Sequence, residues 1–171
     1  MAESTFVISE ARPETELQEL FDLINEAFDV EMGDRGVAFK KEGSRRFLTL
    51  DELAQKLCTC RTLVLRNHGD DAHRIMGVMC YDVDGAKLHF GPFAVAPRVQ
   101  GAGVGRALLE RTYSEGRAQG CSCVEIHVVN HRSDVLAMYE RMGYVRFDEE
   151  PFPFPERCTR PSFFVLLRKE L

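Results

Sequence analysis

The 171-residue sequence has no long apolar run and no surplus of basic residues. No stretch approaches the ~20 apolar residues that a membrane-spanning helix needs. The first residues, with Glu3 and Glu10, lack the basic-then-apolar pattern of a signal peptide. Lysine and arginine number 22 against 27 aspartates and glutamates, a net charge of -5, whereas nucleic-acid binders usually carry a basic surplus. We therefore expect a cytoplasmic protein with neither a membrane nor a nucleic acid as its partner.

The six cysteines lack the spacing of a metal centre or a redox motif. They form no C-x-x-C pair, and the two C-x-C pairs and five histidines do not complete the ligand pattern of a zinc site. Several lie in apolar stretches, among them Cys80 and Cys123, where cysteine packs as a small hydrophobic residue. We expect reduced, structural cysteines and no metal.

What is present is the composition of a globular protein. Hydrophobic residues make up 44% and charged residues 29% of the chain, and its length suits one domain, residues 1–171, with one core. Apolar periodicity predicts an α/β fold in which a mixed sheet carries helices on both faces. The expected strands are 5–9, 62–66, 75–83, 87–95, 123–129, 144–147 and 162–167, and the expected helices begin near residues 13, 50, 103 and 134.

A glycine-rich turn between an apolar strand and an amphipathic helix is the strongest functional signal. The turn consists of Gln100, Gly101, Ala102, Gly103, Val104 and Gly105. Glycine permits positive φ and a close approach of a ligand to the backbone, and the free N–H groups at the start of a helix bind anions. Because Arg106 adds a positive charge beside these groups, the turn suits a pyrophosphate.

Two nucleotide-binding motifs fit this turn poorly. A G-x-x-x-x-G-K-[ST] loop needs a lysine that is absent here, and a dinucleotide fingerprint needs G-x-G-x-x-G where this sequence has G-x-G-x-G. The turn could therefore bind a pyrophosphate in a way that neither motif describes. Two alternatives remain: the protein is a nucleotide-dependent oxidoreductase, or the turn is a tight connection that binds no ligand.

The residues around the turn resemble the signature of the GNAT superfamily of N-acetyltransferases. The family pattern [QR]-x-x-G-x-[GA] is filled by Gln100, Gly103 and Gly105, after the lead-in residues Val95 and Pro97. A second stretch, 138–144, resembles the family's L-Y-E-x-x-G-[FY] helix end. Two motifs in the family's order are more specific than either alone, and the order of the expected elements also matches along nearly the whole chain.

The resemblance implies a GNAT fold, with a mostly antiparallel sheet that splays between the strands 87–95 and 123–129, and acetyl-CoA as the acetyl donor. It implies that a backbone N–H near Val95 polarises the acetyl carbonyl. It also implies an asparagine contact to CoA seven residues before the motif tyrosine, where this sequence has Arg132, so Asn130 is the candidate. The residues implied to bind CoA are Phe93, Ala94, Val95, Gln100, Gly101, Ala102, Gly103, Val104, Gly105, Arg106 and Asn130.

The same resemblance suggests the catalytic groups. Tyr139 is the candidate acid, because the family places this hydroxyl near the CoA sulfur and a phenol can protonate a departing thiolate. His89 takes the position at which some members carry a basic carboxylate, and histidine accepts protons near neutral pH. Glu125, His127 or a water molecule are the alternative bases, and packed structural roles remain open for each of these side chains.

We therefore expect an N-acetyltransferase that transfers acetyl directly to a primary amine, and the alternative is a non-catalytic acyl-CoA-sensing module. The acceptor, a small molecule or a peptide amine, stays unidentified. Two expected loops, 31–47 and 148–161, would shape its site, and carboxylates in the second could attract an amine. The last strand, 162–167, could act as an exposed edge and pair two copies into a homodimer.

Overall fold

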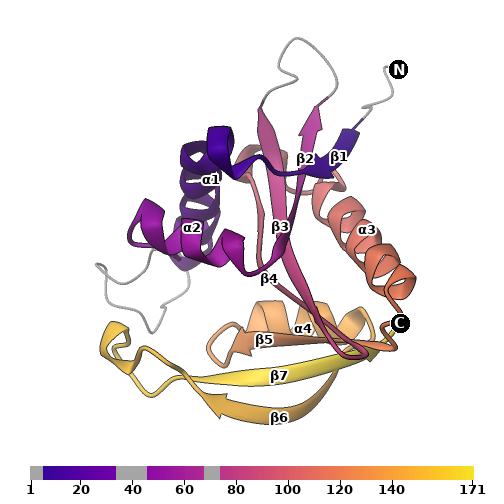
Figure 1. Cartoon of the computed structure of the whole chain (residues 1–171). Helices are drawn as coiled ribbons and strands as arrows, with labels where there is room; N and C mark the ends of the chain where they lie inside the picture. Colours follow the sequence, from indigo (N-terminus) through magenta and orange to yellow (C-terminus); the bar gives the residue numbers. More distant parts are fainter. Residues whose placement is uncertain (1–5, 34–45, 68–73) are drawn as a thin grey trace.

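The computed structural model describes residues 6–33, 46–67 and 74–171. In these ranges the chain forms one seven-stranded sheet and four α-helices (Figure 1). The strands are β1 (Phe6–Glu10), β2 (Arg61–Asn67), β3 (Ile75–Asp84), β4 (Lys87–Val95), β5 (Cys123–Val129), β6 (Val145–Pro151) and β7 (Phe163–Glu170). The helices are α1 (Pro13–Gly33), α2 (Leu50–Cys58), α3 (Val104–Ala118) and α4 (Ser133–Arg141), with short 3₁₀ turns η2 (Pro97–Val99) and η3 (Pro155–Arg157).

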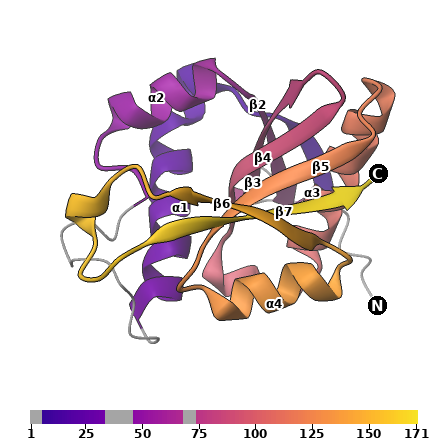
Figure 2. The same ribbon diagram turned by 90° about the horizontal axis from the view of Figure 1, so that it is seen from below.

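The sheet divides where β4 meets β5. Its order is β1-β2-β3-β4-β5-β7-β6, and the β4–β5 pair is the parallel one among antiparallel neighbours. That pair has three registered positions and ends at His89 and Glu125. Past this point the two strands separate (Figures 1 and 2). The expected central splay is confirmed, and β4 beyond Phe90 pairs with β3 only.

Helices cover both faces of the sheet, as expected. The cluster under α1 and α2 contains Leu20, Ile24 and Leu53, all fully buried. The cluster under α3 and α4 contains Leu108 and Leu136. The apolar stripe that starts α1 therefore faces the sheet, because side chains three and four residues apart share one side of a helix. None of the described helices combines the length and the hydropathy that crossing a membrane requires.

Two of the expected boundaries are wrong. β6 extends to Pro151, so residues 148–151 are a strand and not part of a loop. All seven residues of β6 are exposed, which allows three acidic residues in a row and removes the apolar alternation that reveals a strand. Helix α1 continues to Gly33, into the expected loop 31–47. Residues 34–45 of that loop lie outside the described residues.

The expectation that the last strand is an exposed edge is also wrong. β7 lies between β5 and β6 and pairs with both along its length. Both of its backbone edges are therefore occupied, and β7 offers no edge to a second copy. The sheet edges are β1 and β6.

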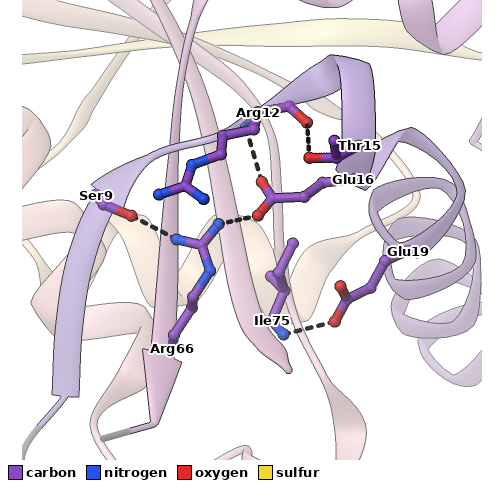
Figure 3. A network of polar contacts seen from close by, with 7 residues as sticks. All are labelled: Ser9, Arg12, Thr15, Glu16, Glu19, Arg66 and Ile75. Carbon is purple, nitrogen blue, oxygen red and sulfur yellow. Dashed lines mark hydrogen bonds and ion pairs between the residues drawn. The ribbon is translucent and has the colours of Figure 1, made fainter. Parts of the chain in front are cut away.

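A polar network fastens the start of α1 to the sheet (Figure 3). Arg66 on β2 donates hydrogen bonds to Ser9 on β1 and to Glu16 on α1. The second oxygen of Glu16 accepts the backbone N–H of Arg12 at 2.7 Å. The side chains of Arg66 and Glu16 are each 14% exposed, so this ion pair lies largely out of water.

We expect Arg66→Met to lower the free energy of unfolding by about 3 kcal/mol, because it leaves the Glu16 carboxylate buried without its partner. The matched control is Arg61→Met on the same strand, whose partner Glu10 lies 3.7 Å away and is 72% exposed. That exposed pair is worth less than about 1 kcal/mol. Urea unfolding followed by circular dichroism measures both, since the chain has no tryptophan. Equal losses in the two variants would contradict the expectation.

Candidate active site

The glycine turn links the end of β4 to α3. Gly101 and Gly103 have φ of +83° and +86°, a conformation that residues with a Cβ rarely adopt. A Cβ at either glycine would meet nothing within 4 Å, so the backbone here faces open space. Gly105 differs from these two: a Cβ there would lie 3.1 Å from Cζ of Phe93, so the ring would have to shift by a few tenths of an ångström. Two of the glycines therefore set the conformation, and the third makes room for a neighbouring ring.

The turn uses some of its N–H groups internally and leaves others at the helix start. The N–H groups of Gln100 and Ala102 donate to the carbonyls of Pro97 and Val99, at 3.3 and 3.2 Å. The N–H groups in the first turn of α3 have no acceptor within the helix, as at any helix N-terminus. They can bind an anion, with the positive end of the helix dipole behind them.

A cavity of about 1120 Å³ opens beside the turn and runs into the splay between β4 and β5. One part of its lining comes from the turn and β4, including Gly103, Phe93 and Val95. Another part comes from α1, from Arg46 and from the β6–β7 connection. That connection lies below α1 and α2 in Figure 1, and Arg157 within it contacts Glu52 of α2.

Tyr139 on α4 lines this cavity and is 5% exposed. Its ring packs against Tyr144, with centroids 5.1 Å apart, and against Phe90, with centroids 6.2 Å apart. The hydroxyl groups of Tyr144 and Tyr113 are 2.6 Å apart, and burial raises the pKa of both phenols. This neutral, buried pair is a structural support behind the Tyr139 ring.

The three candidate bases all line the cavity but differ in their contacts. His89 lies across from Asp82 on β3 and from Glu125 on β5, at the last paired position before the splay. Glu125 accepts hydrogen bonds from Arg168 and Lys87. Burial acts to raise the pKa of Glu125, but these two cations outweigh it and hold the pKa below its ordinary value. His127 lies 3.3 Å from a carboxylate oxygen of Glu150. Since a carboxylate held by two cations is a weak base, the geometry favours a histidine.

The structure brings most of the proposed site residues to one cavity. They are His89, Phe93, Val95, Gln100, Gly101, Gly103, Gly105, Arg106 and Tyr139. Ala94 and Val104 are buried in the core on opposite faces of the sheet, and Ala102 is not among the lining residues. Asn130 does not line the cavity either, because its side-chain oxygen accepts the N–H of Phe163 at 3.1 Å and extends the β5–β7 pairing.

A comparison with known protein families identifies the family of this chain. Residues 17–144 match the family described as Acetyltransferase (GNAT) family. The chain belongs to the GNAT acetyltransferase family.

Solved structures show the same fold at low sequence identity. The IAA acetyltransferase from Bacillus cereus has a TM-score of 0.69 at 19% identity, with 98% of this chain and 100% of that chain covered. The ribosomal-protein-alanine N-acetyltransferase from Brucella melitensis has a TM-score of 0.67 at 17% identity, covering 96% and 99%. A GNAT family acetyltransferase from Elizabethkingia anophelis with acetyl-CoA bound has a TM-score of 0.69 at 17% identity, covering 97% and 98%.

Sequence reasoning missed several residues at the GNAT cavity. Arg132, at the position where the family often has asparagine, lines the cavity and donates from two nitrogens to the carboxylate of Asp134. Phe28, at the end of the apolar stripe of α1, packs against the core cluster under α1 and α2 and also lines the cavity. Arg46 and Arg157 lie in the two loops expected to shape the acceptor site. Each arginine stands over a phenylalanine ring near it in sequence, a pairing that could have singled them out.

Proposed function

We propose that this GNAT protein is an N-acetyltransferase, one domain over residues 1–171, that moves acetyl from acetyl-CoA to a primary amine. The observation that carries the proposal is the pair of positive-φ glycines at the start of α3, which face open space at a cavity that also holds His89 and Tyr139. A cytoplasmic location, where acetyl-CoA is available, is part of the same proposal.

The backbone around the turn suits CoA in two ways. Those N–H groups between Gln100 and Arg106 that are not bonded within the turn would hold the pyrophosphate, with no side chain in the way at Gly101 and Gly103. The β5-facing edge of β4 from Phe93 to Val95 has no partner strand, so the amides of the pantetheine arm would pair there as an added strand does. The carbonyl of Val95 accepts a hydrogen bond from the Gln100 side chain at 3.2 Å. The other backbone groups on this edge of β4 would therefore pair with the pantetheine arm.

The transfer then needs three groups around the acetyl carbonyl. His89 would accept a proton from the attacking amine, directly or through water, as the N–C bond forms. A backbone N–H near Val95 would stabilise the oxyanion. As the C–S bond breaks, Tyr139 would give its proton to the sulfur. One proton leaves the amine and one reaches the thiolate, so the products are the amide and free CoA.

Calorimetric titration with acetyl-CoA tests the first half of this proposal. We expect micromolar binding, about −8 kcal/mol, and no binding of NADH, because the turn lacks the dinucleotide spacing. Release of free thiol in the presence of a panel of amines tests the second half. Failure to bind acetyl-CoA would overturn the proposed donor. Binding without amine-dependent thiol release would instead favour the acyl-CoA-sensing module.

A further inference from the structure

The acceptor side of the cavity holds two cations that lack a close carboxylate partner among the described residues. Arg46 and Arg157 both line it. The Arg46 guanidinium lies over the face of Phe47, at 4.9 Å from the ring centre, and forms no ion pair with a carboxylate of the described residues. Arg157 stands over the ring of Phe154 at 4.5 Å and reaches Glu52 only at 3.9 Å.

Glu52 is a poor counter-ion for both arginines. Its other oxygen accepts the N–H of Leu48 at 2.7 Å, at the start of α2. Burial lowers the pKa of Arg46, and the positive charge of Arg157 also lowers it, while Cys80 and Glu52 act in the opposite direction. Arginine stays protonated even so, and a partly buried charge is unfavourable unless it is paired. The two guanidinium groups therefore form a site for an anion that comes from outside the protein.

Most of the other charges at the cavity are matched, but Lys56 and Asp82 also line it and form no ion pair among the described residues. Arg106 pairs with Glu110 at 2.8 Å, and Glu125 is held by Arg168 and Lys87. Glu150 lies beside His127. The carboxylates of the expected loop 148–161 could attract an amine. Of these, Glu150 lines the cavity and is paired with His127, and the described lining residues include no cluster of unpaired carboxylates from this segment.

Phenylalanine rings lie next to the arginines. Phe152 packs edge to face on Phe164, with centroids 5.1 Å apart, and on Phe154, at 6.1 Å, and all three line the cavity. These rings provide an apolar wall whose outer ring, Phe154, is 41% exposed. A ligand seated here would place an apolar body on the rings and an anionic group at the two guanidinium forks.

We propose that the acceptor is an amine that also carries a carboxylate and an apolar body, as an apolar amino acid does. Arg46 and Arg157 bind the carboxylate, which matches the planar guanidinium fork, and the rings of Phe152 and Phe154 bind the apolar part. This inference rests on the proposed acetyltransferase function. It specifies that the acceptor carries an anionic group, where the sequence left every class of amine open.

Matched acceptors test the role of the carboxylate. Phenylalanine, leucine and glycine are each compared with their carboxamides by thiol release at saturating acetyl-CoA. We expect kcat/KM to favour at least one carboxylate over its carboxamide by about tenfold or more. The carboxamide amine is the less basic of each pair and more of it is neutral, so intrinsic reactivity alone gives the opposite order. Equal use of both members in all pairs, or a stronger preference for phosphoethanolamine, overturns the proposal.

Variants test whether the two arginines are responsible. Arg46→Met and Arg157→Met should each remove most of the carboxylate preference, and Arg157→Lys should restore part of it. Arg117→Met, an exposed charge on α3 away from the cavity, is the control for net charge and should keep the full preference. Preference retained in the Arg157 variant overturns the proposal even if Arg46→Met does not fold.

A binding measurement separates this inference from the proposed function. Titration with N-acetylphenylalanine and its carboxamide needs no reaction, and we expect the acid to bind about tenfold more tightly than the amide in the parent protein only. If neutral amines are acetylated as well as acids and both product analogues bind alike, the acetyltransferase stands and this inference fails. If acetyl-CoA does not bind at all, the proposed function fails first.

Discussion

Glutamate in place of Gly103 should abolish acetyl-CoA binding and leave a folded protein. The substituted residue must keep a φ near +86°, which costs about 1–2 kcal/mol for a residue with a Cβ. Its carboxylate enters space that is open in the protein and that the proposal assigns to the pyrophosphate. Two unit charges about 4 Å apart near a protein surface repel by about 4 kcal/mol, so we expect an affinity loss of at least ~100-fold.

Two controls separate backbone strain from charge. Gly103→Ala introduces the strain alone and should weaken binding far less than glutamate. Gly120→Glu places the same side chain just beyond the other end of α3, where φ is +82° and the space around a Cβ is again open. Calorimetry should find normal acetyl-CoA binding in that variant, with a similar loss of stability. Normal binding in Gly103→Glu would exclude the turn as the pyrophosphate site.

Removal of the Tyr139 hydroxyl should slow turnover by about 100-fold, the usual contribution of a positioned acid. Tyr139→Phe keeps the ring, so its packing against Phe90 and Tyr144 is preserved. The affinity for acetyl-CoA should therefore stay close to that of the parent protein. Steady-state thiol release gives kcat, and calorimetry gives the affinity.

The neighbouring tyrosine is the matched control for this variant. Tyr144→Phe removes a hydroxyl that bonds to Tyr113 and that does not line the cavity. We expect it to lower the free energy of unfolding by about 1–2 kcal/mol, with kcat little changed. An unchanged kcat in Tyr139→Phe, or equal losses of kcat in the two variants, would remove Tyr139 from the proton transfer and leave it as a core aromatic.

Much of the fold could be predicted because its signals are local. The apolar stripe of α1 and the glycine turn each depend on residues within a few positions of one another. Positive φ at Gly101 and Gly103 is a property of the backbone at those residues. The second motif, around Tyr139, likewise lies within a single helix end. Local patterns of this kind were sufficient to identify the family and the splayed sheet.

The position of a strand within the sheet depends on residues far away in the sequence, and here the predictions from the sequence were wrong. β7 resembles any apolar strand, and only its pairing with β5 and β6 makes it interior. β6 carries Asp148, Glu149 and Glu150 in a row, because an exposed edge strand gains its hydrogen bonds from β7 and needs no apolar face. Similarly, Asn130 was expected at the cavity, but its side chain completes the hydrogen bonding of Phe163.

By itself, the sequence determined the family, the order of elements and the turn proposed to bind CoA, since each is encoded in short contiguous patterns. The tertiary structure alone brought together Arg46 and Arg157, the two residues proposed to bind the acceptor, at one cavity. Arg46 and Arg157 are far apart in the chain, and nothing in either segment reveals whether a carboxylate will lie beside them. Whether a charge is neutralised depends on distances between side chains of different elements, and the fold sets those distances.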